Sequence, residues 1–239
     1  MKLLQNVYQV GGPSLSHSYD ATVYLLKGNE GWFLIDCGTP EGYEQIKANI
    51  QKIGVEPKDI QFILGTHGHY DHVGSAHLWK KDFGCKLFLH EKDIEQVESG
   101  DSVKTSASIL YGVESTPCKV DGEIAEGDIW QGENLKVEAI YTPGHTMGSV
   151  SFDVKVGEYS LLIAGDAIWG GYCKKIGSDE AAWFKTLDKI TERHFDFYTF
   201  GHVNPQLIAD ADQRLKEAKK AFANYYNPWF KTFFEEYHY

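Results

Sequence analysis

The stretch Thr66-His67-Gly68-His69-Tyr70-Asp71-His72 places three histidines and one aspartate within six residues. Such a cluster is costly in a packed core, because each imidazole has two ring nitrogens to satisfy and the carboxylate carries a charge. A metal ion resolves both demands, since neutral imidazole and carboxylate are standard ligands of divalent cations such as zinc. His67 and His69 are spaced to share one metal, and Asp71 and His72 can turn toward a second. We therefore expect a metal site here rather than an exposed polar loop.

The cluster lies where ligands usually bind. It follows the apolar run Ile60–Leu64 and so occupies a loop at the carboxyl end of an expected strand. Open α/β sheets usually place their ligands in such loops. Further strands are expected in the first half of the chain over Asn6–Val10, Ala21–Lys27, Gly31–Cys37 and Lys86–His90, with helices over Gly42–Ile53 and Gly74–Phe83. This alternation predicts helices packed on a sheet.

The second half repeats the alternation after a long connection. From Ser99 to Glu133 the pattern weakens, and one short helix is expected over Val103–Leu110. Strands are then expected over Leu135–Tyr141, Ser149–Val156, Tyr159–Ala164 and Phe197–Phe200, and helices over Ala181–Glu192 and Pro205–Ala223. Because no repeat or linker divides the chain, we predict one domain over residues 1–239 with a C-terminal helical tail at 205–239. The aromatic-rich end of that tail should pack onto the body or against the second subunit of a homodimer.

Three later positions have the same strand-end setting as the histidine cluster. His145 stands in Thr142-Pro143-Gly144-His145-Thr146, Asp166 follows the apolar run Leu161–Gly165, and His202 follows Phe200-Gly201. Each alone would be explained as a cap or a turn residue. Glycines beside all three allow close backbone approach at such turns. Together these three residues supply the further ligands that a two-metal site at the cluster needs.

Composition and charge exclude several classes of partner. The chain of 239 residues has 23 Lys and Arg against 34 Asp and Glu, a net charge of -11. Nucleic acids and anionic membranes bind dense basic patches, so neither is an expected partner. The four cysteines show no C-x-x-C spacing, which is typical of reduced thiols in a cytosolic protein. Without a signal-like segment or a long apolar run, we predict a cytoplasmic protein that acts on a small molecule.

The segments HGHYDH, TPGHTMGS, AGD and GH, in this order, resemble the metal-binding motifs of the metallo-β-lactamase superfamily. The resemblance spans Val23 to His202. It implies a four-layer α/β-β/α sandwich, in which two mixed sheets pack face to face with helices outside. All the motifs should then meet at one edge of the sandwich.

Carried over residue by residue, the resemblance implies two divalent metal ions, with zinc expected and iron or manganese as alternatives. The first metal would be bound by His67, His69 and His145, the second by Asp71, His72 and His202, and both by a bridging Asp166. Asp36 resembles a family position that orients a ligand histidine. A simple strand-end turn carboxylate explains Asp36 equally well. His17, His77, His90, His194 and His238 have no motif support and are expected to be structural or exposed.

The expected activity is that of a dinuclear, zinc-type hydrolase. Two ions a few Å apart can bind one hydroxide between them, and metal coordination makes this hydroxide available near neutral pH. It would attack a small ester, thioester or lactone, while Asp71 orients it or carries a proton to the leaving group. No serine or cysteine nucleophile is required.

Asp166 also indicates a branch of the superfamily. The antibiotic-degrading branches lack a bridging aspartate there, so its presence favours esterase, lactonase or thioesterase relatives. Only 37 residues (203–239) follow His202, so we expect the large glutathione-binding domain of glyoxalase II to be absent or much reduced. Lactonases carry a tyrosine shortly after the bridging aspartate, where this chain has Trp169 with Tyr172 nearby.

Two other functions remain open. One is a non-haem iron redox enzyme that resembles the persulfide dioxygenases, and the other is a protein that binds metal without catalysis. Loops build specificity in such sites. We expect the substrate to be enclosed by Val103–Tyr111, Ile168–Tyr172 and the C-terminal aromatic residues.

Overall fold

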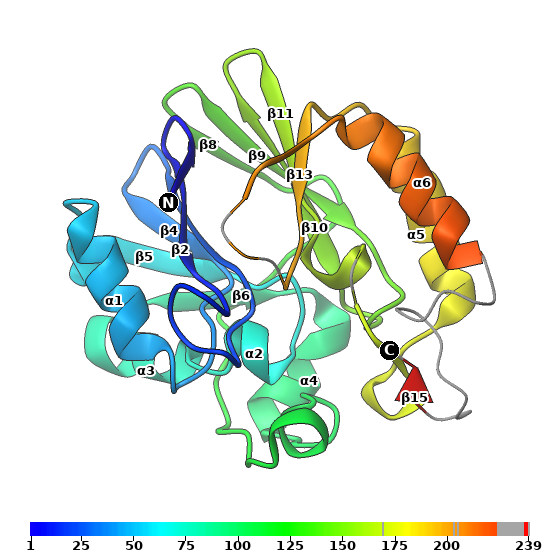
Figure 1. Cartoon of the computed structure of the whole chain (residues 1–239). Coiled ribbons are helices and arrows are strands. Elements are labelled where there is room, and N and C mark those ends of the chain that lie inside the picture. Colours follow the sequence, from blue (N-terminus) through cyan, green and yellow to red (C-terminus); the bar gives the residue numbers. More distant parts are fainter. Residues whose placement is uncertain (169, 203, 205, 224–236, 239) are drawn as a thin grey trace.

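The fold is built around a seven-stranded mixed sheet and a six-stranded mixed sheet (Figure 1). The computed structural model describes residues 1–168, 170–202, 204, 206–223 and 237–238. In the first sheet the strands follow chain order: β1 (Lys2–Leu4), β2 (Val7–Gly11), β3 (Val23–Lys27), β4 (Trp32–Ile35), β5 (Ile60–Leu64), β6 (Lys86–Leu89) and β7 (Gly122–Glu123). The pairs from β1 to β4 are antiparallel and those from β4 to β7 are parallel.

The second sheet has the strand order β14-β13-β11-β10-β9-β8. Its strands are β8 (Ile129–Gly132), β9 (Leu135–Tyr141), β10 (Val150–Val156), β11 (Tyr159–Ile163), β13 (Phe197–Thr199) and β14 (Ile208–Ala209). Only the β11–β13 pair among them is parallel. A separate pair joins β12 (Tyr172–Cys173) to β15 (Tyr237–His238) at the C-terminal end.

Helices cover the outer face of each sheet (Figure 1). The α-helices are α1 (Tyr43–Lys52), α2 (Tyr70–Val73), α3 (Ala76–Phe83), α4 (Glu91–Ser99), α5 (Glu180–Thr191) and α6 (Ala211–Ala223). Shorter turns are η1 (Pro57–Asp59), η2 (Ala107–Tyr111), η3 (Gly165–Ala167) and η4 (Lys174–Ile176).

No helix in the part of the chain that the structure describes is long and apolar enough to cross a membrane.

Alternating side chains of the strands define the layers. In β4, Leu34 packs in the core beneath α1 and α3, whereas Phe33 packs in the core between the two sheets. In β11, Leu161 enters the core between the sheets and Leu162 the core beneath α5 and α6. Successive residues of a strand point to opposite faces, so each sheet separates two cores. Helices, sheet, sheet and helices thus form the predicted four-layer sandwich, which is confirmed.

The structure corrects the predicted helix over Pro205–Ala223. Helix α6 begins only at Ala211, because Ile208 and Ala209 extend the edge of the second sheet by pairing with β13. Asp210, at φ 57°, separates this strand from the helix. Of the predicted tail at 205–239, the described residues are helical only in α6, and Tyr237–His238 form strand β15. The aromatic residues at 225–236 and 239 lie outside the described residues.

The long connection also differs from its prediction. The helix expected over Val103–Leu110 is a single π-helical turn, η2, and Ser106 before it adopts φ 64°. Helix α4 and strands β1, β7 and β8 were not predicted, since each is short or only weakly patterned.

All four cysteines are free and buried, as the reduced-thiol prediction requires.

Candidate metal centre

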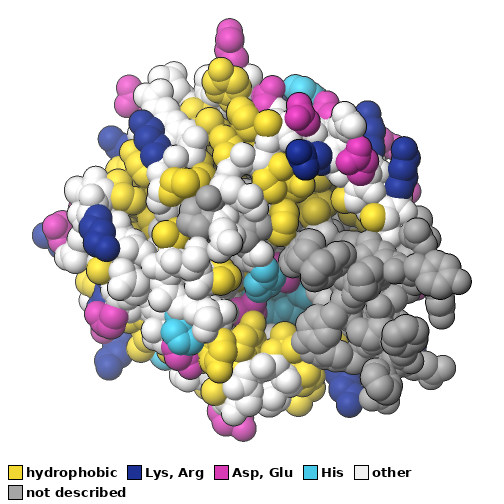
Figure 2. Space-filling view, viewed as in Figure 1, with side chains coloured by type: hydrophobic (Ala, Val, Ile, Leu, Met, Phe, Trp, Pro, Cys, Tyr) yellow, Lys and Arg dark blue, Asp and Glu magenta, His cyan; other side chains and the backbone are white. Residues whose placement is uncertain are grey.

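All seven side chains of the predicted site come from strand ends at one edge of the sandwich. His67 and His69 follow β5, and Asp71 and His72 lie on α2, the short helix that comes next. From the second sheet, His145 lies in the loop between β9 and β10, Asp166 in η3 after β11, and His202 after β13. Figure 2 shows histidine and acidic side chains at the bottom of a hollow in the surface. The structure therefore brings together residues from both halves of the chain.

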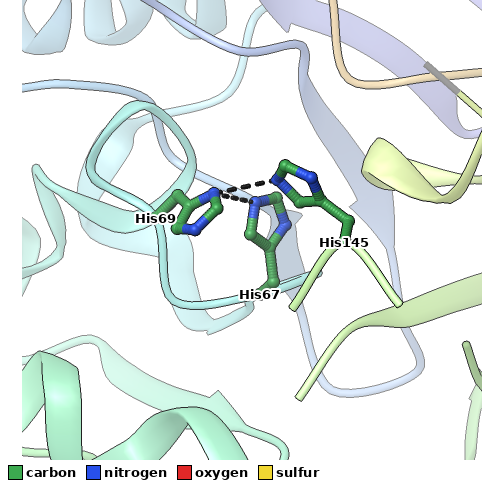
Figure 3. A group of neighbouring side chains, drawn as sticks. All are labelled: His67, His69 and His145. Atoms are coloured by element: carbon green, nitrogen blue, oxygen red, sulfur yellow. Dashed lines mark hydrogen bonds between the residues drawn. The ribbon is translucent and has the colours of Figure 1, made fainter. Parts of the chain in front are cut away.

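Three histidines form the first group (Figure 3). The Nδ1 atom of His69 lies 2.9 Å from Nε2 of His67 and 3.0 Å from Nε2 of His145. In a tetrahedral zinc site with bonds of about 2.0–2.1 Å, neighbouring ligand atoms are about 3.3 Å apart. All three histidines are buried, two of the nitrogen pairs are close to this spacing, and all three nitrogens lie within 4.8 Å of one another.

A second group lies beside the first. The Nε2 atoms of His72 and His202 lie 3.6 Å and 3.3 Å from Oδ2 of Asp71. His72 and Asp71 are buried, whereas the side chain of His202 is 30% exposed. His202 is therefore the histidine of the cluster that is most open to solvent.

Asp166 stands between the two groups. Its Oδ2 atom lies 3.3 Å from Nε2 of His145 in the first group and 3.2 Å from Nε2 of His202 in the second. Its Oδ1 atom lies 3.4 Å from Nε2 of His72. One carboxylate thus contacts ligand-type atoms of both groups, as a bridging ligand must.

The chemistry of the donor set fits metal ions. Oδ1 of Asp166 and Nε2 of His72 are buried and have no hydrogen-bond partner among the described residues. Buried polar atoms are rarely left unpaired, because their desolvation then goes uncompensated. A divalent cation would satisfy both atoms, and overlapping triads of His and Asp are spaced to hold one.

Comparison with known proteins places this geometry in a family. Residues 19–202 match the family model described as the metallo-beta-lactamase superfamily. The chain belongs to this superfamily. Together with the histidine and aspartate cluster, membership supports the general prediction of a metal-dependent hydrolase.

Individual members of the superfamily cover different parts of the chain. A probable metallo-hydrolase of Methanocaldococcus jannaschii is 33% identical over 156 residues, which are 64% of this chain and 69% of that protein. A hydroxyacylglutathione hydrolase of Pelagibacter ubique is 30% identical over 124 residues, 51% of this chain and 43% of that protein. A metallo-beta-lactamase from Elizabethkingia meningoseptica superposes with a TM-score of 0.74 at 26% identity, over 94% of this chain and 90% of that one.

Hydrogen bonds behind the metallo-beta-lactamase motifs hold two of the clustered histidine rings. Asp36 accepts a hydrogen bond from Nδ1 of His72 at 2.8 Å, and it also accepts from the backbone N–H and the hydroxyl of Thr66 at 2.7 and 2.8 Å. Nδ1 of His145 donates to the carbonyl of Gly171 at 2.7 Å. Such partners fix the ring and leave the opposite nitrogen free for a metal. Asp36 thus contacts the ring of His72 directly, which fits the orienting role better than that of a simple turn carboxylate.

The electrostatics divide the two groups. Burial, reinforced by the neighbouring imidazoles, holds the pKa of His67 and of His69 well below the ordinary histidine value, and burial also lowers the pKa of His145. These rings are therefore neutral and offer lone pairs. Burial acts in the same direction on His72 and His202, but the surrounding carboxylates outweigh it and raise both pKa values. The second group thus attracts positive charge.

Glycines allow the close approach that the centre requires. A Cβ atom at Gly201 would lie 1.9 Å from Oδ1 of Asp166, and one at Gly170 would lie 2.6 Å from Nδ1 of His145. Any larger residue at either position would displace a side chain of the centre. The glycine before His202 in the GH motif is therefore explained by packing against Asp166.

The histidines without motif support lie outside the cluster. Nδ1 of His77 contacts the carbonyl of Gly74 at 2.9 Å, His90 caps α4, and His194 pairs with Asp212. His17 packs edge-on against Tyr19. The side chain of His238 and the whole of Trp169, which was expected near the substrate, lie outside the described residues.

One residue that touches the centre from behind was not predicted. Asp93, on α4, is buried and accepts a hydrogen bond from the backbone N–H of Gly68, inside the HGHYDH motif. The sequence around it gave no signal, since α4 itself was missed and a single aspartate in a helical turn is common.

Proposed function

We propose that the chain is a dinuclear metal hydrolase, with zinc as the expected metal, that acts on a small ester, thioester or lactone. The position of Asp166 between two groups of imidazole nitrogens carries this proposal, because a single metal would not need a carboxylate shared by both. Family membership supports hydrolysis in general. The number of ions, the metal and the substrate class are proposed here.

In this proposal the ligands are divided as the motifs suggest. His67, His69 and His145 would hold the first ion, Asp71, His72 and His202 the second, and Asp166 both. When bound, two such ions supply an activated water and polarise the carbonyl oxygen of a substrate.

Asp71 is the proposed proton carrier of the chain. Its Oδ2 atom lies 3.3 Å from Nε2 of His202, the most exposed histidine of the centre. The backbone carbonyl of Asp71 accepts from the N–H of Ala21 at 3.1 Å, which holds the start of α2 against the first sheet. A carboxylate in this position can take a proton at the reacting centre and pass it to a leaving group.

Aromatic and apolar side chains close to the motifs favour a small neutral substrate in this proposal. The ring of Tyr70, in the HGHYDH motif, lies 5.6 Å from that of Tyr111, which in turn lies 5.0 Å from that of Tyr19. Tyr19 is 40% exposed, and Met147, two residues after His145, is 36% exposed. Hydrophobic side chains border the hollow in Figure 2. An acyl group fits such a border better than a phosphate does.

A substrate screen tests the proposal. Zinc-loaded protein would be assayed with a thioester, a lactone, a carboxyl ester, a phosphodiester and a chromogenic β-lactam. We expect turnover of at least one of the first three, loss of turnover after exhaustive chelation, and recovery when zinc is returned. Turnover that survives chelation, or hydrolysis of the β-lactam or the phosphodiester alone, would contradict the proposal. The variant His77→Ala, in the same segment but outside the cluster, serves as the control and should behave as wild type.

A further inference from the structure

A buried carboxylate lies outside both groups of proposed ligands. Asp93 is in the first turn of α4 and is 2% exposed. Its Oδ2 atom accepts from the backbone N–H of Gly68 at 2.8 Å and from the hydroxyl of Thr146 at 2.8 Å. Its Oδ1 atom accepts from the backbone N–H of Gly148 at 3.0 Å. All of these donors are neutral groups.

The donors belong to the two loops that carry the three-histidine group. Gly68 stands between His67 and His69, and Thr146 directly follows His145. A single oxygen atom of Asp93 therefore joins the loop after β5 to the loop between β9 and β10. On the other side of these loops, Nδ1 of His69 and Nε2 of His145 are 3.0 Å apart.

Close packing makes this link specific for aspartate. A Cβ atom at Gly148 would lie 2.4 Å from Cγ of Asp93, and one at Gly68 would lie 3.2 Å from its Cβ and 2.5 Å from Nε2 of Gln96. The loop of Gly148 thus approaches Asp93 more closely than a residue with a side chain would allow, and the loop of Gly68 packs tightly against α4. A glutamate at position 93 is longer by one methylene and would not fit this space.

We propose that Asp93 is a positioning residue that sets the spacing between His69 and His145 and thereby the metal affinity of the three-histidine group. The inference rests on the ligand assignment of the proposed function. Removal of groups that orient metal ligands typically weakens metal binding by about 10- to 100-fold. The loops are also joined at their base, where the N–H of Val150 donates to the carbonyl of Thr66 at 2.7 Å. Loss of Asp93 should therefore loosen the group without unfolding it.

The test isolates each group of ligands in turn. Asp93→Asn would be introduced into a His202→Ala background, which keeps the three-histidine group, and into a His145→Ala background, which keeps the other. Zinc affinity would be measured by competition with a chromophoric chelator, without any substrate. We expect Asp93→Asn to weaken zinc binding by about 10- to 100-fold in the first background and to leave it unchanged in the second.

Two further variants control for folding. Asp153, on β10, is another buried carboxylate, and it accepts from the hydroxyl of Ser160 at 2.8 Å rather than from a donor of either loop. Asp153→Asn should leave zinc affinity unchanged in both backgrounds. Thr146→Val removes only the hydroxyl donor and should weaken zinc binding in the first background, by less than Asp93→Asn. The visible spectrum of the cobalt-loaded protein should change for Asp93→Asn and not for Asp153→Asn, since it reports ligand geometry.

The outcomes separate this inference from the proposed function. Equal zinc affinity for Asp93→Asn, Thr146→Val and their parent would overturn the role of Asp93 and leave the proposed function standing. Equal weakening in the two backgrounds would also overturn it, because the effect would then not belong to the three-histidine group. If the His202→Ala background binds no zinc at all, both proposals fail. If zinc binds as expected but no substrate is hydrolysed, only the proposed function fails.

Discussion

Asp166 is surrounded by imidazoles. It is 5% exposed, and the Nε2 atoms of His72, His145 and His202 lie 3.2 to 3.4 Å from its oxygens. Burial alone would raise the pKa of this carboxyl, but His202 and His72, whose own pKa values are raised, outweigh burial and hold the pKa well below its ordinary value. Asp166 is therefore ionised throughout the neutral range. A buried negative charge shared by two groups of nitrogens is suited to hold two cations close together.

Asp166→Ala should separate a two-metal centre from a one-metal centre. The variant loses the anionic charge between the ions, so one of them should bind much more weakly, and the metal content should fall from about two ions per chain to about one. Turnover should fall by at least 100-fold. Metal content by elemental analysis and turnover would be measured on samples with equal circular dichroism.

His77→Ala is the matched control, because His77 lies in the same segment and its Nδ1 contacts only a backbone carbonyl among the described atoms. It should retain wild-type metal content and turnover. An Asp166→Ala protein that is fully metallated and fully active would refute the bridged centre.

At the scale of elements, the strands and most helices could be predicted because their patterns are local. The run Ile60–Leu64 is strand β5, with the predicted bounds, and the apolar spacing over 43–53 gives α1. The seven proposed ligands were found for a related reason. His67, His69, His145, Asp166 and His202 each stand beside a glycine, and Asp71 and His72 complete the HGHYDH motif, so the motifs can be recognised before the fold is known.

The remaining features depend on contacts between distant residues. Ile208 is a strand residue only because Tyr198 offers it a partner at the sheet edge, and no local pattern shows that edge. Asp93 has its role only because Gly68 and Thr146, 25 and 53 residues away, come to the same place. Local sequence patterns cannot show the pairing of Ile208 or the hydrogen bonds of Asp93, because these contacts exist only in the folded chain.

The junction between α5 and α6 should respond to pH. His194, which follows α5, forms a hydrogen bond at 2.7 Å with Asp212 on α6. This hydrogen bond raises the pKa of His194 above the ordinary histidine value. The folded state thus holds this proton more tightly than the unfolded state, so the contact stabilises the fold below the ordinary pKa of about 6.5 and is lost as pH rises through the raised value. In thermal denaturation, wild type should be more stable than His194→Ala at pH 6, and the difference should vanish at pH 9.

Removal of His194 leaves no cavity, because its side chain is 71% exposed. The two proteins should be compared only above pH 5. Burial would raise the pKa of Asp212, but its hydrogen bonds with Phe195 and His194 outweigh burial and lower this pKa. The stabilisation that Asp212 itself contributes is therefore lost only in acid. A stability difference that is the same at pH 6 and pH 9 would show that protonation of His194 is not involved.

For the whole molecule, the centre joins the two sheets. His67, His69, Asp71 and His72 follow a strand of the first sheet, and His145, Asp166 and His202 follow strands of the second. A ligand that binds only the folded protein stabilises it by about 2.7 kcal/mol when its free concentration is 100 times the dissociation constant. Metal binding should therefore stabilise the whole sandwich.

Metal removal should accordingly lower the thermal midpoint. For a chain of this size about 2.7 kcal/mol corresponds to a shift of roughly 5–10 °C. Scanning calorimetry would compare zinc-loaded protein with protein dialysed against a chelator. His67→Ala should show a much smaller difference between the two conditions. A thermal midpoint that is the same with and without zinc would mean that the centre does not bind metal in the folded state.

The order of the ligands along the chain also decides when the centre can form in time. His72 leaves the ribosome 130 residues before His202 (202 minus 72). At a synthesis rate of about 5–20 residues per second, roughly 7–26 seconds pass between the synthesis of the first four proposed ligands and that of the last one. During this interval the nascent chain carries only part of the proposed ligand set, and any abundant transition metal can bind to it. Because the proposed ligands from the second sheet are synthesised last, we expect the complete set to form only after both sheets have been made.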